Sequence, residues 1–255
     1  MLHKDERFDV FASFFLYPVG YVTGLLARRM QVPSVLTVVG NDVKKYTFSP
    51  EKIGLCQSGL TNADRLVALS HELRDMAHAL TPVAEKSRII YNSVTVTERP
   101  WQPRASEERF FRIGSAGIFK YEKGLPYLFK AVSRLRGSRK AILELRGSLR
   151  PSEKATYDEM VKRTHMEDRV RLLERLPHDA MPDWFRTLDV FVLPSVSEGC
   201  PNVLMESLAT GVPSVGTTTG AVPELIEDRV SGLLVPWGNS RSEERRVGKE
   251  CRSRW

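Results

Sequence analysis

Apolar runs of strand length alternate with amphipathic segments of helix length along most of this chain. In the first half the runs are residues 9–15, 34–40, 65–70 and 88–94, with helical segments near 19–30 and 71–80 between them. Most positions in these runs are apolar, which is typical of parallel strands buried on both faces by helices. The pattern predicts an α/β fold, and it assigns no element to the polar segment after residue 40.

The second half repeats this architecture. Strand candidates are residues 112–118, 141–147, 170–174, 189–195, 213–218 and 232–237, and helices are expected to begin near Gly124, Ser152, His178, Pro201 and Val222. Two successive halves of this kind predict two Rossmann-like, doubly wound domains facing each other across a cleft. Ligands are expected at the carboxyl ends of the strands, where the turns are rich in glycine.

A polar stretch without periodicity, residues 95–108, holds two prolines and predicts an interdomain linker. We therefore expect a first lobe over residues 1–94, a linker over 95–109 and a second lobe over 110–240. Residues 241–255 carry nine charges in fifteen positions and resemble translated sequencing-adapter sequence. We expect them to be a non-native tail, and a natural solvated tail is the alternative.

Composition narrows the class of protein. With 42% hydrophobic and 27% charged residues and a net charge of +7, the chain is globular and mildly basic. It has no dense basic stripe interleaved with aromatic residues, so an anionic small ligand is expected rather than nucleic acid. Three cysteines without a CxxC pair disfavour disulfides and zinc and favour a reducing cytoplasm.

One uncharged segment, residues 10–27, is long enough for a membrane span or a signal peptide. Pro18 and Gly20 interrupt it in the middle, where a strand-to-helix turn would place them. The segment is therefore expected to hold a strand, a turn and the start of a helix, with a span or signal peptide as the alternative.

The segment Leu193–Val215, LPSVSEGCPNVLMESLATGVPSV, carries the most chemistry. A strand ends at its start, and a helix begins near Pro201, where free backbone N–H groups can bind hydroxyls or phosphate oxygens. Glu206 on this helix has apolar neighbours and should have a fixed partner, for which a ribose diol is suited. From the residues alone, two glutamates at the spacing of Glu198 and Glu206 would more often be surface charges.

This segment resembles the donor-site signature E-G-x-P-x-x-x-x-E-A of the retaining two-lobe (GT-B) glycosyltransferases, known as group 1 or family 4. Four of the signature residues are present, namely Glu198, Gly199, Pro201 and Glu206. The resemblance implies that Glu206 binds the ribose of a nucleotide sugar. It also implies that Glu198, as a catalytic residue, and the turn Gly199, Cys200, Pro201 and Asn202 hold the donor sugar.

A second segment, Gly114–Val132, resembles the G-R-L-x-x-E-K-G turn that holds the donor diphosphate in this family, and it has Gly117, Glu122, Lys123 and Gly124 in place. Ile118 stands where the arginine is usual, so Lys120 is the candidate for the second charge. The resemblance implies that Lys123 binds the diphosphate and acts in catalysis. A cation placed there stabilises the charge that the leaving group gains. Base contacts are expected near Leu173.

In the first lobe, VVGNDV resembles the family's H-G-x-D-V turn, which suggests an acceptor side at Gly40 and Asp42, although Val39 replaces the histidine. GTTTGAVPEL (Gly216–Leu225) resembles the family's Gly-Gly-x-Pro-Glu loop, and a plain helix start explains it nearly as well. The matched region spans roughly residues 9–239. Family members extend further at both ends, so the chain is expected to be a fragment whose first lobe is incomplete.

Absent motifs exclude other enzyme classes. The sequence has no D-x-D, no G-x-G-x-x-G after a strand, no P-loop and no histidine cluster with metal spacing. Together with these absences, the resemblance implies a retaining transferase that needs no metal or cofactor, with a UDP- or GDP-linked sugar as donor.

The resemblance implies a sugar, glycan or lipid-linked acceptor and a role in polysaccharide or cell-envelope synthesis. The enzyme would then work in the cytoplasm or at the inner membrane face. The alternatives are a donor-binding fragment without turnover and an inverting two-lobe enzyme.

Overall fold

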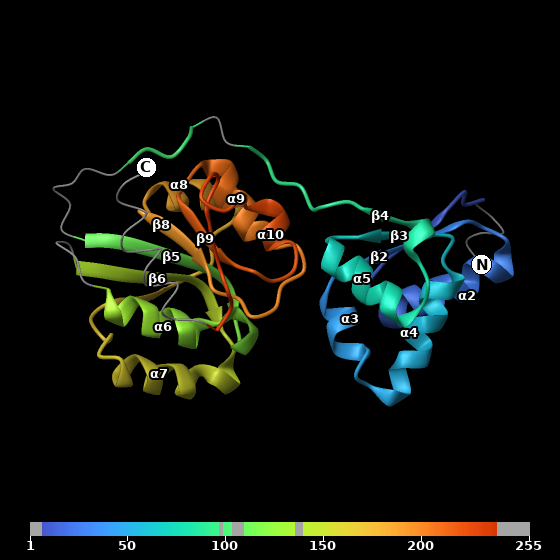
Figure 1. The fold of residues 1–255 in the computed structure, drawn as a ribbon, viewed down its shortest axis with the longest axis horizontal. Coiled ribbons are helices and arrows are strands. Elements are labelled where there is room, and N and C mark those ends of the chain that lie inside the picture. Colours follow the sequence, from blue (N-terminus) through green and yellow to red (C-terminus); the bar gives the residue numbers. More distant parts are fainter. Residues whose placement is uncertain (1–6, 97–98, 104–109, 136–139, 239–255) are drawn as a thin grey trace. The chain divides into compact units, whose positions relative to one another are not determined.

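The computed structural model describes residues 7–96, 99–103, 110–135 and 140–238. The chain divides into a first unit, Met1–Asn92, and a second unit, Ser93–Trp255. In the described residues each unit contains one parallel sheet with helices around it (Figure 1), which confirms the predicted α/β class with two Rossmann-like lobes. The expected tail and most of the second half of the linker lie outside the described residues.

The sheet of the first unit has the strand order β1-β2-β3-β4. Its strands are β1 (Phe11–Phe14), β2 (Ser34–Val38), β3 (Arg65–Ala68) and β4 (Ser87–Ile89). Helix α2 (Tyr21–Met30) joins β1 to β2, and α5 (His71–Leu80) joins β3 to β4. The Ser70 hydroxyl caps α5 by accepting a hydrogen bond from the Leu73 amide at 3.1 Å.

The uncharged segment at residues 10–27 holds β1, a π-helical turn η1 (Leu16–Gly20) and the first part of α2, as the sequence predicts. Within the described part of the chain, every helix is too short or too polar to cross a bilayer.

Two helices of the first unit were not predicted, α3 (Asn41–Tyr46) and α4 (Pro50–Asn62). The buried residues of α4 are Cys56, Gly59 and Leu60, of which only Leu60 is large and aliphatic. So few apolar positions over thirteen residues give no stripe that a sequence pattern can reveal. The helix forms because Pro50 suits its first turn and because it packs against η1 and α2.

The sheet of the second unit has the order β10-β9-β8-β5-β6-β7. Its strands are β5 (Phe110–Phe119), β6 (Lys140–Leu149), β7 (Val170–Leu173), β8 (Val190–Leu193), β9 (Ser214–Thr217) and β10 (Leu233–Val235). Counted within the unit, this is the Rossmann order 3-2-1-4-5-6 reversed end for end. The order changes direction between β5 and β8, and ligands of such sheets bind at the carboxyl ends of the strands at that point.

Helices cover both faces of this sheet (Figure 1). On one face, α6 (Leu125–Arg134) and α7 (Lys154–Arg163) contribute Phe129 and Tyr157 to an apolar cluster that includes Ile113. On the other, α8 (Met181–Arg186), α9 (Asn202–Thr210) and α10 (Val222–Leu225) form a second cluster around Trp184 and Phe185. Apolar clusters therefore cover both faces of the central strands, as is typical of a parallel sheet, while Leu172 on the edge strand β7 is exposed.

Candidate functional site

Glycines shape the carboxyl ends of β5 and β6. Gly117 and Gly147 have φ of 145° and 138°, which side chains rarely adopt. They lie opposite each other in the β5–β6 register, and a Cβ at Gly147 would lie 2.0 Å from the carbonyl oxygen of Gly117. Gly124 is the N-cap residue of α6, and a Cβ at this position would lie 1.9 Å from the carbonyl oxygen of Pro194. The turn after β5 is therefore packed directly against the end of β8.

The loop after β9 packs against the turn between β8 and α9 and donates a hydrogen bond to it. The Ala221 amide donates a hydrogen bond to the Gly199 carbonyl at 2.7 Å. A Cβ at Gly220 would lie 2.5 Å from the carbonyl oxygens of both Glu198 and Gly199. This close packing fixes the turn and buries Cys200. Asn202 then begins α9, so the amides of its first turn point towards the switch point.

An ion pair joins the two motif segments. Lys123 Nζ lies 2.6 Å from Glu198 Oε1, and the Ser195 hydroxyl donates to the same oxygen at 2.6 Å. The Glu198 side chain is only 9% exposed, so its charge is held largely away from water. Lys120 lies apart from this pair and binds Glu122, 3.2 Å away.

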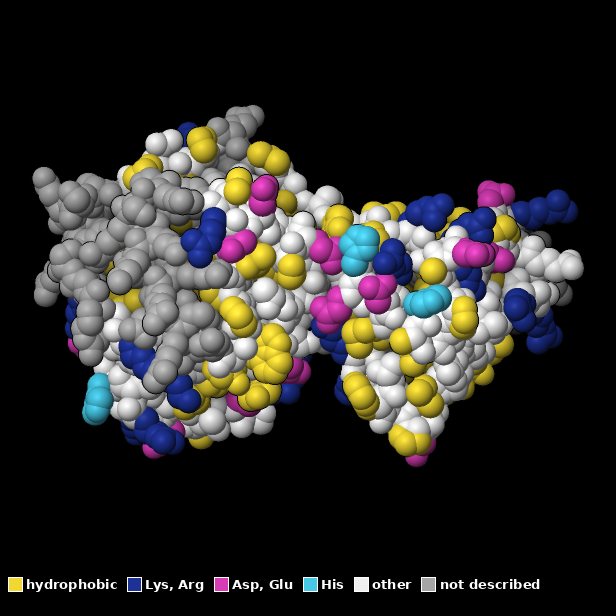
Figure 2. Space-filling view, in the orientation of Figure 1, with side chains coloured by type: hydrophobic (Ala, Val, Ile, Leu, Met, Phe, Trp, Pro, Cys, Tyr) yellow, Lys and Arg dark blue, Asp and Glu magenta, His cyan; other side chains and the backbone are white. Residues whose placement is uncertain are grey.

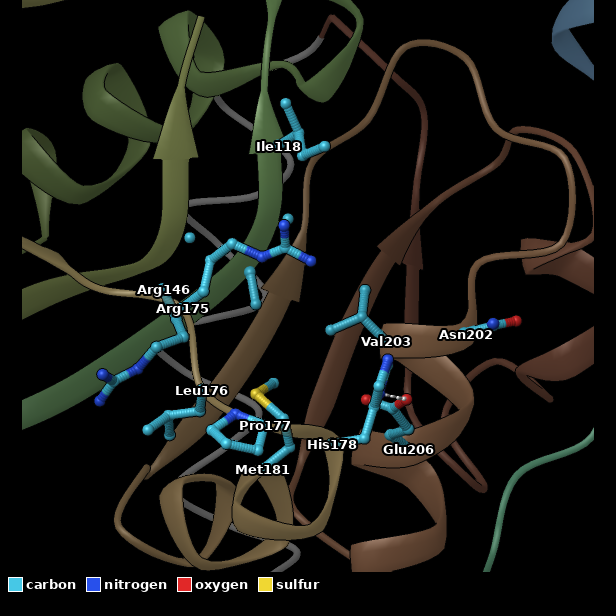
Figure 3. Close-up of a pocket in the computed structure, with 13 residues that line it drawn as sticks. Ile118, Arg146, Arg175, Leu176, Pro177, His178, Met181, Asn202, Val203 and Glu206 are labelled. Carbon is cyan, nitrogen blue, oxygen red and sulfur yellow. Dashed lines mark ion pairs between the residues drawn. The ribbon is translucent and has the colours of Figure 1, made fainter.

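A cavity of about 660 Å³ opens at the carboxyl ends of the strands (Figure 3). The structure brings three of the predicted donor residues into its lining: Gly117, Asn202 and Glu206. The other predicted donor residues do not line it, and they are Lys120, Lys123, Leu173, Glu198, Gly199, Cys200 and Pro201. Figure 3 shows Ile118 at one end of this cavity and Leu176, Pro177 and Met181 at the other.

Glu206 lies on α9 and faces His178, which precedes α8 (Figure 3). His178 Nδ1 is 3.3 Å from Glu206 Oε1, and the side chains are 89% and 19% exposed, respectively. Burial raises the pKa of the Glu206 carboxyl, and His178 partly opposes that rise. A partly buried carboxylate with a solvent-exposed partner can exchange that partner for the hydroxyls of a ligand.

Sequence reasoning did not identify Arg146, Arg175 and His178 as cavity residues. Arg146 Nη1 donates a hydrogen bond to the Glu174 carbonyl at 3.1 Å, and its guanidinium carbon lies 5.4 Å from the centre of the Trp184 ring. Its Nε is buried, and among the described residues it has no hydrogen-bond partner. Desolvation lowers the pKa of this guanidinium. The available signal was a charged residue near the end of the apolar run AILELRG.

The residues predicted for the acceptor side lie in the first unit. Asp42 is 2% exposed, and its carboxylate accepts hydrogen bonds from the Leu16 amide at 2.6 Å and the Gly40 amide at 2.8 Å. These bonds hold the turn before α3, where Gly40 has φ of 142°. The geometry gives Asp42 a structural task, and contact with an acceptor stays a prediction.

Comparison with known proteins identifies relatives of this chain. Residues 110–247 match the family model described as "Glycosyl transferases group 1". A Bacillus subtilis glycosyltransferase named for teichuronic acid biosynthesis is 26% identical over 92% of this chain and 60% of its own length. The N-acetyl-alpha-D-glucosaminyl L-malate synthase of Bacillus anthracis is 26% identical over 93% of this chain and 64% of its own length. The chain thus spans less than two thirds of these relatives.

Solved structures share the fold. HepE of Anabaena in complex with UDP-glucose superposes with a TM-score of 0.82 at 19% identity, over 96% of this chain and 69% of that protein. Sucrose-phosphate synthase of Thermosynechococcus elongatus superposes with a TM-score of 0.78 at 18% identity, over 96% and 65%. At this identity the likeness supports the two-lobe GT-B architecture.

Proposed function

Because this chain belongs to the group 1 glycosyl transferases, we propose that it transfers a sugar from a nucleotide-sugar donor to an acceptor hydroxyl with retention of configuration. The reaction needs no metal ion, and the donor is UDP- or GDP-linked. The relatives named for teichuronic acid and glucosaminyl malate synthesis support a hexosyl donor. A polysaccharide, glycan or lipid-linked acceptor in cell-envelope synthesis fits the first of these names.

The observation that carries the proposal is the cavity at the switch point of the second unit. Its lining includes the two glycines Gly117 and Gly147, the start of α9 at Asn202, and the partly buried carboxylate of Glu206. Free amides at a helix start suit phosphate oxygens. A carboxylate suits a ribose diol, because each of its oxygens can accept one hydroxyl proton.

The proposed catalytic step also uses Lys123 and Glu198, which do not line this cavity and whose roles are implied by the family resemblance. The bond between the anomeric carbon and the diphosphate oxygen breaks, and the acceptor oxygen bonds to the same face of that carbon. The acceptor proton passes to the departing phosphate oxygen. Lys123, held by Glu198 at 2.6 Å, stabilises the negative charge that grows on the leaving group. Glu198 also holds the donor sugar, while Glu206 binds the ribose equally before and during reaction.

A second function has one observation in its favour. The predicted acceptor residue Asp42 is buried, and its carboxylate is bound to the backbone amides of Leu16 and Gly40. A donor-binding module without turnover would fit these facts. It would share the donor site and lack the transfer step.

Product analysis separates the two functions. The 255-residue chain is incubated with UDP- and GDP-hexoses and candidate acceptors, and products are detected by mass spectrometry. Nuclear magnetic resonance then gives the anomeric configuration. A product with retained configuration supports the transferase, and inversion contradicts the retaining mechanism. Donor binding by calorimetry without any product favours the binding module, and absence of donor binding contradicts both.

A further inference from the structure

Part of the stretch that the sequence predicts to be an interdomain linker is bound to the second unit, and Trp101 carries this attachment. Its backbone amide donates a hydrogen bond to the Thr210 carbonyl at 2.7 Å. Its indole Nε1 donates to the Leu188 carbonyl at 2.8 Å. The ring also packs against the apolar cluster around Trp184 and Phe185. One residue therefore joins the end of α9 to the segment between α8 and β8.

A neighbouring bond ties the same stretch to α8. Arg186 is the last residue of this helix, and its Nε donates a hydrogen bond to the Arg99 carbonyl at 2.8 Å. Its Nη1 lies 2.6 Å from Asp183 Oδ1, one turn back on the helix, which orients the guanidinium. We call Arg99 and Trp101 the linker clasp. The clasp holds the C-terminal ends of α8 and α9.

The opposite ends of these two helices line the cavity (Figure 3). Met181 begins α8, and Asn202, Val203 and Glu206 lie on α9. Helix α9 has nine residues, so the clasp lies about 13 Å or less along the helix axis from the cavity. A rigid helix of this length carries a displacement from one end to the other.

Thr210 connects the clasp to Glu206. Its hydroxyl donates a hydrogen bond to the Glu206 carbonyl at 2.8 Å, and its own carbonyl accepts the Trp101 amide. The last carbonyls of a helix have no partner within the helix, so the Trp101 amide satisfies one of them. Thr210 is 1% exposed, and a buried carbonyl that loses its donor costs free energy. Helix α9 is therefore held where this bond can form.

We infer that Trp101 is a positioning residue for the donor site, because it holds α9 where Glu206 meets the ribose of the nucleotide. This inference rests on the proposed function, since it takes Glu206 as the ribose-binding carboxylate. Trp101 does not line the cavity, so it acts on the ligand through α9.

Calorimetric titration of the 255-residue chain with UDP and with GDP tests the inference, at a temperature well below unfolding. Trp101→Ala removes the ring and its Nε1 donor, and it should weaken binding of the preferred nucleotide roughly three- to tenfold. Trp101→Phe keeps an aromatic ring on the cluster and should weaken binding roughly two- to threefold. Trp237→Ala is the matched control, because Trp237 is 56% exposed, and it should leave the affinity unchanged.

A double-mutant cycle separates positioning from a general loosening of the fold. In a Glu206→Gln background, Trp101→Ala should cause a further loss of less than about 1.5-fold, because the group that it positions has already been changed. A residue that acts on the whole fold would cause the same loss in both backgrounds. If Trp101→Ala does not fold, Trp101→Phe takes its place in the cycle.

Hydrogen exchange gives a readout that needs no ligand. In either Trp101 variant the backbone amides of α9 should exchange at least about threefold faster than in the wild type. The amides of α6, on the other face of the sheet, should keep their rates.

Three results overturn the inference and leave the proposed function standing: unchanged nucleotide affinity in the folded Trp101 variants, an equal loss in both backgrounds, or unchanged exchange in α9. A wild type that binds neither nucleotide contradicts the proposed function. In that case, exchange in α9 alone decides whether Trp101 positions this helix.

Discussion

The two units treat their apolar side chains differently. In the second unit, two clusters of buried residues cover both faces of a six-stranded sheet. In the first unit, eight large apolar side chains between Phe8 and Leu26 are at least 38% exposed, and they lie on or beside β1, η1 and α2. Parallel sheets are stable when helices cover both faces. The second unit therefore meets this requirement within itself, while the first unit leaves apolar surface along β1 in water.

The two units differ less in the charged side chains on the face drawn in Figure 2 than in the burial of apolar ones. On the face drawn in Figure 2, described Lys and Arg side chains lie among Asp and Glu side chains in both units. On this face the kind of charged side chain therefore does not distinguish the two units. We expect the second unit to be the more stable one and to hold all of the nucleotide affinity.

The largest expected effect comes from a substitution at Gly147, which lines the cavity at the carboxyl end of β6. Gly147→Ala would place a Cβ 2.0 Å from a backbone oxygen at φ of 138°. Neither group can move freely, so we expect about 3 kcal/mol or more of destabilisation, confined to the second unit. All four tryptophans lie after residue 93, so tryptophan fluorescence reports on the second unit, whereas far-ultraviolet circular dichroism reports on both. An unchanged fluorescence transition in denaturant would contradict the close packing.

A pair of lysines sharpens the comparison next. Lys123 pairs with Glu198 at 2.6 Å in the second unit, and Lys44 pairs with Glu72 at 2.7 Å in the first. Charge-assisted bonds to the donor contribute about 1.5–3 kcal/mol, so Lys123→Ala should lower kcat/KM by roughly 10- to 150-fold, mainly through kcat. Lys44→Ala should cost about 0–1 kcal/mol of stability and leave donor turnover unchanged. Equal kinetic losses in both variants would remove the special role of Lys123.

The elements and site residues that the sequence could predict are those that a short segment of the chain specifies by itself. The strands and α9 follow from periodicity, and Glu206 was found because the signature that it shares with the family lies within one short segment, Glu198–Glu206. Arg146 and His178 were missed because the lining of the cavity depends on strand order, which brings β6, the loop after β7 and α9 together. Helix α4 was missed because Leu60 is the only large aliphatic side chain among its buried residues.

The third prediction concerns the carboxylate in the cavity. Glu206→Gln should weaken binding of the nucleoside diphosphate by roughly tenfold at pH 7, because a neutral amide is a poorer acceptor for ribose hydroxyls than a carboxylate. Glu72→Gln is the matched change in the first unit and should leave the affinity unchanged. Calorimetry on the folded variants measures both. If Glu206→Gln binds as tightly as the wild type, Glu206 is a structural helix residue.

The same carboxylate predicts a pH dependence. Burial raises the pKa of Glu206 in the folded state above its value in the unfolded chain, so between these two values the folded state binds more protons. Stability from this group is therefore complete below the unfolded pKa and is lost as pH rises through the folded pKa. Glu206→Gln should be more stable than the wild type at neutral pH, and the difference should shrink as the pH falls. A difference that grows in acid would contradict the raised pKa.

The smallest expected effect lies in the first unit and has the opposite sign. Gly54 is an exposed position inside α4, and a Cβ there would meet nothing within 4 Å. Gly54→Ala should therefore stabilise the first unit by about 0.5–1 kcal/mol, because alanine loses less conformational entropy than glycine in a helix. The denaturant concentration at the midpoint of the circular dichroism transition should rise, while the midpoint of the tryptophan fluorescence transition should stay unchanged. If both transitions move together, the two units unfold as one, and the contrast in burial between them does not divide their stability.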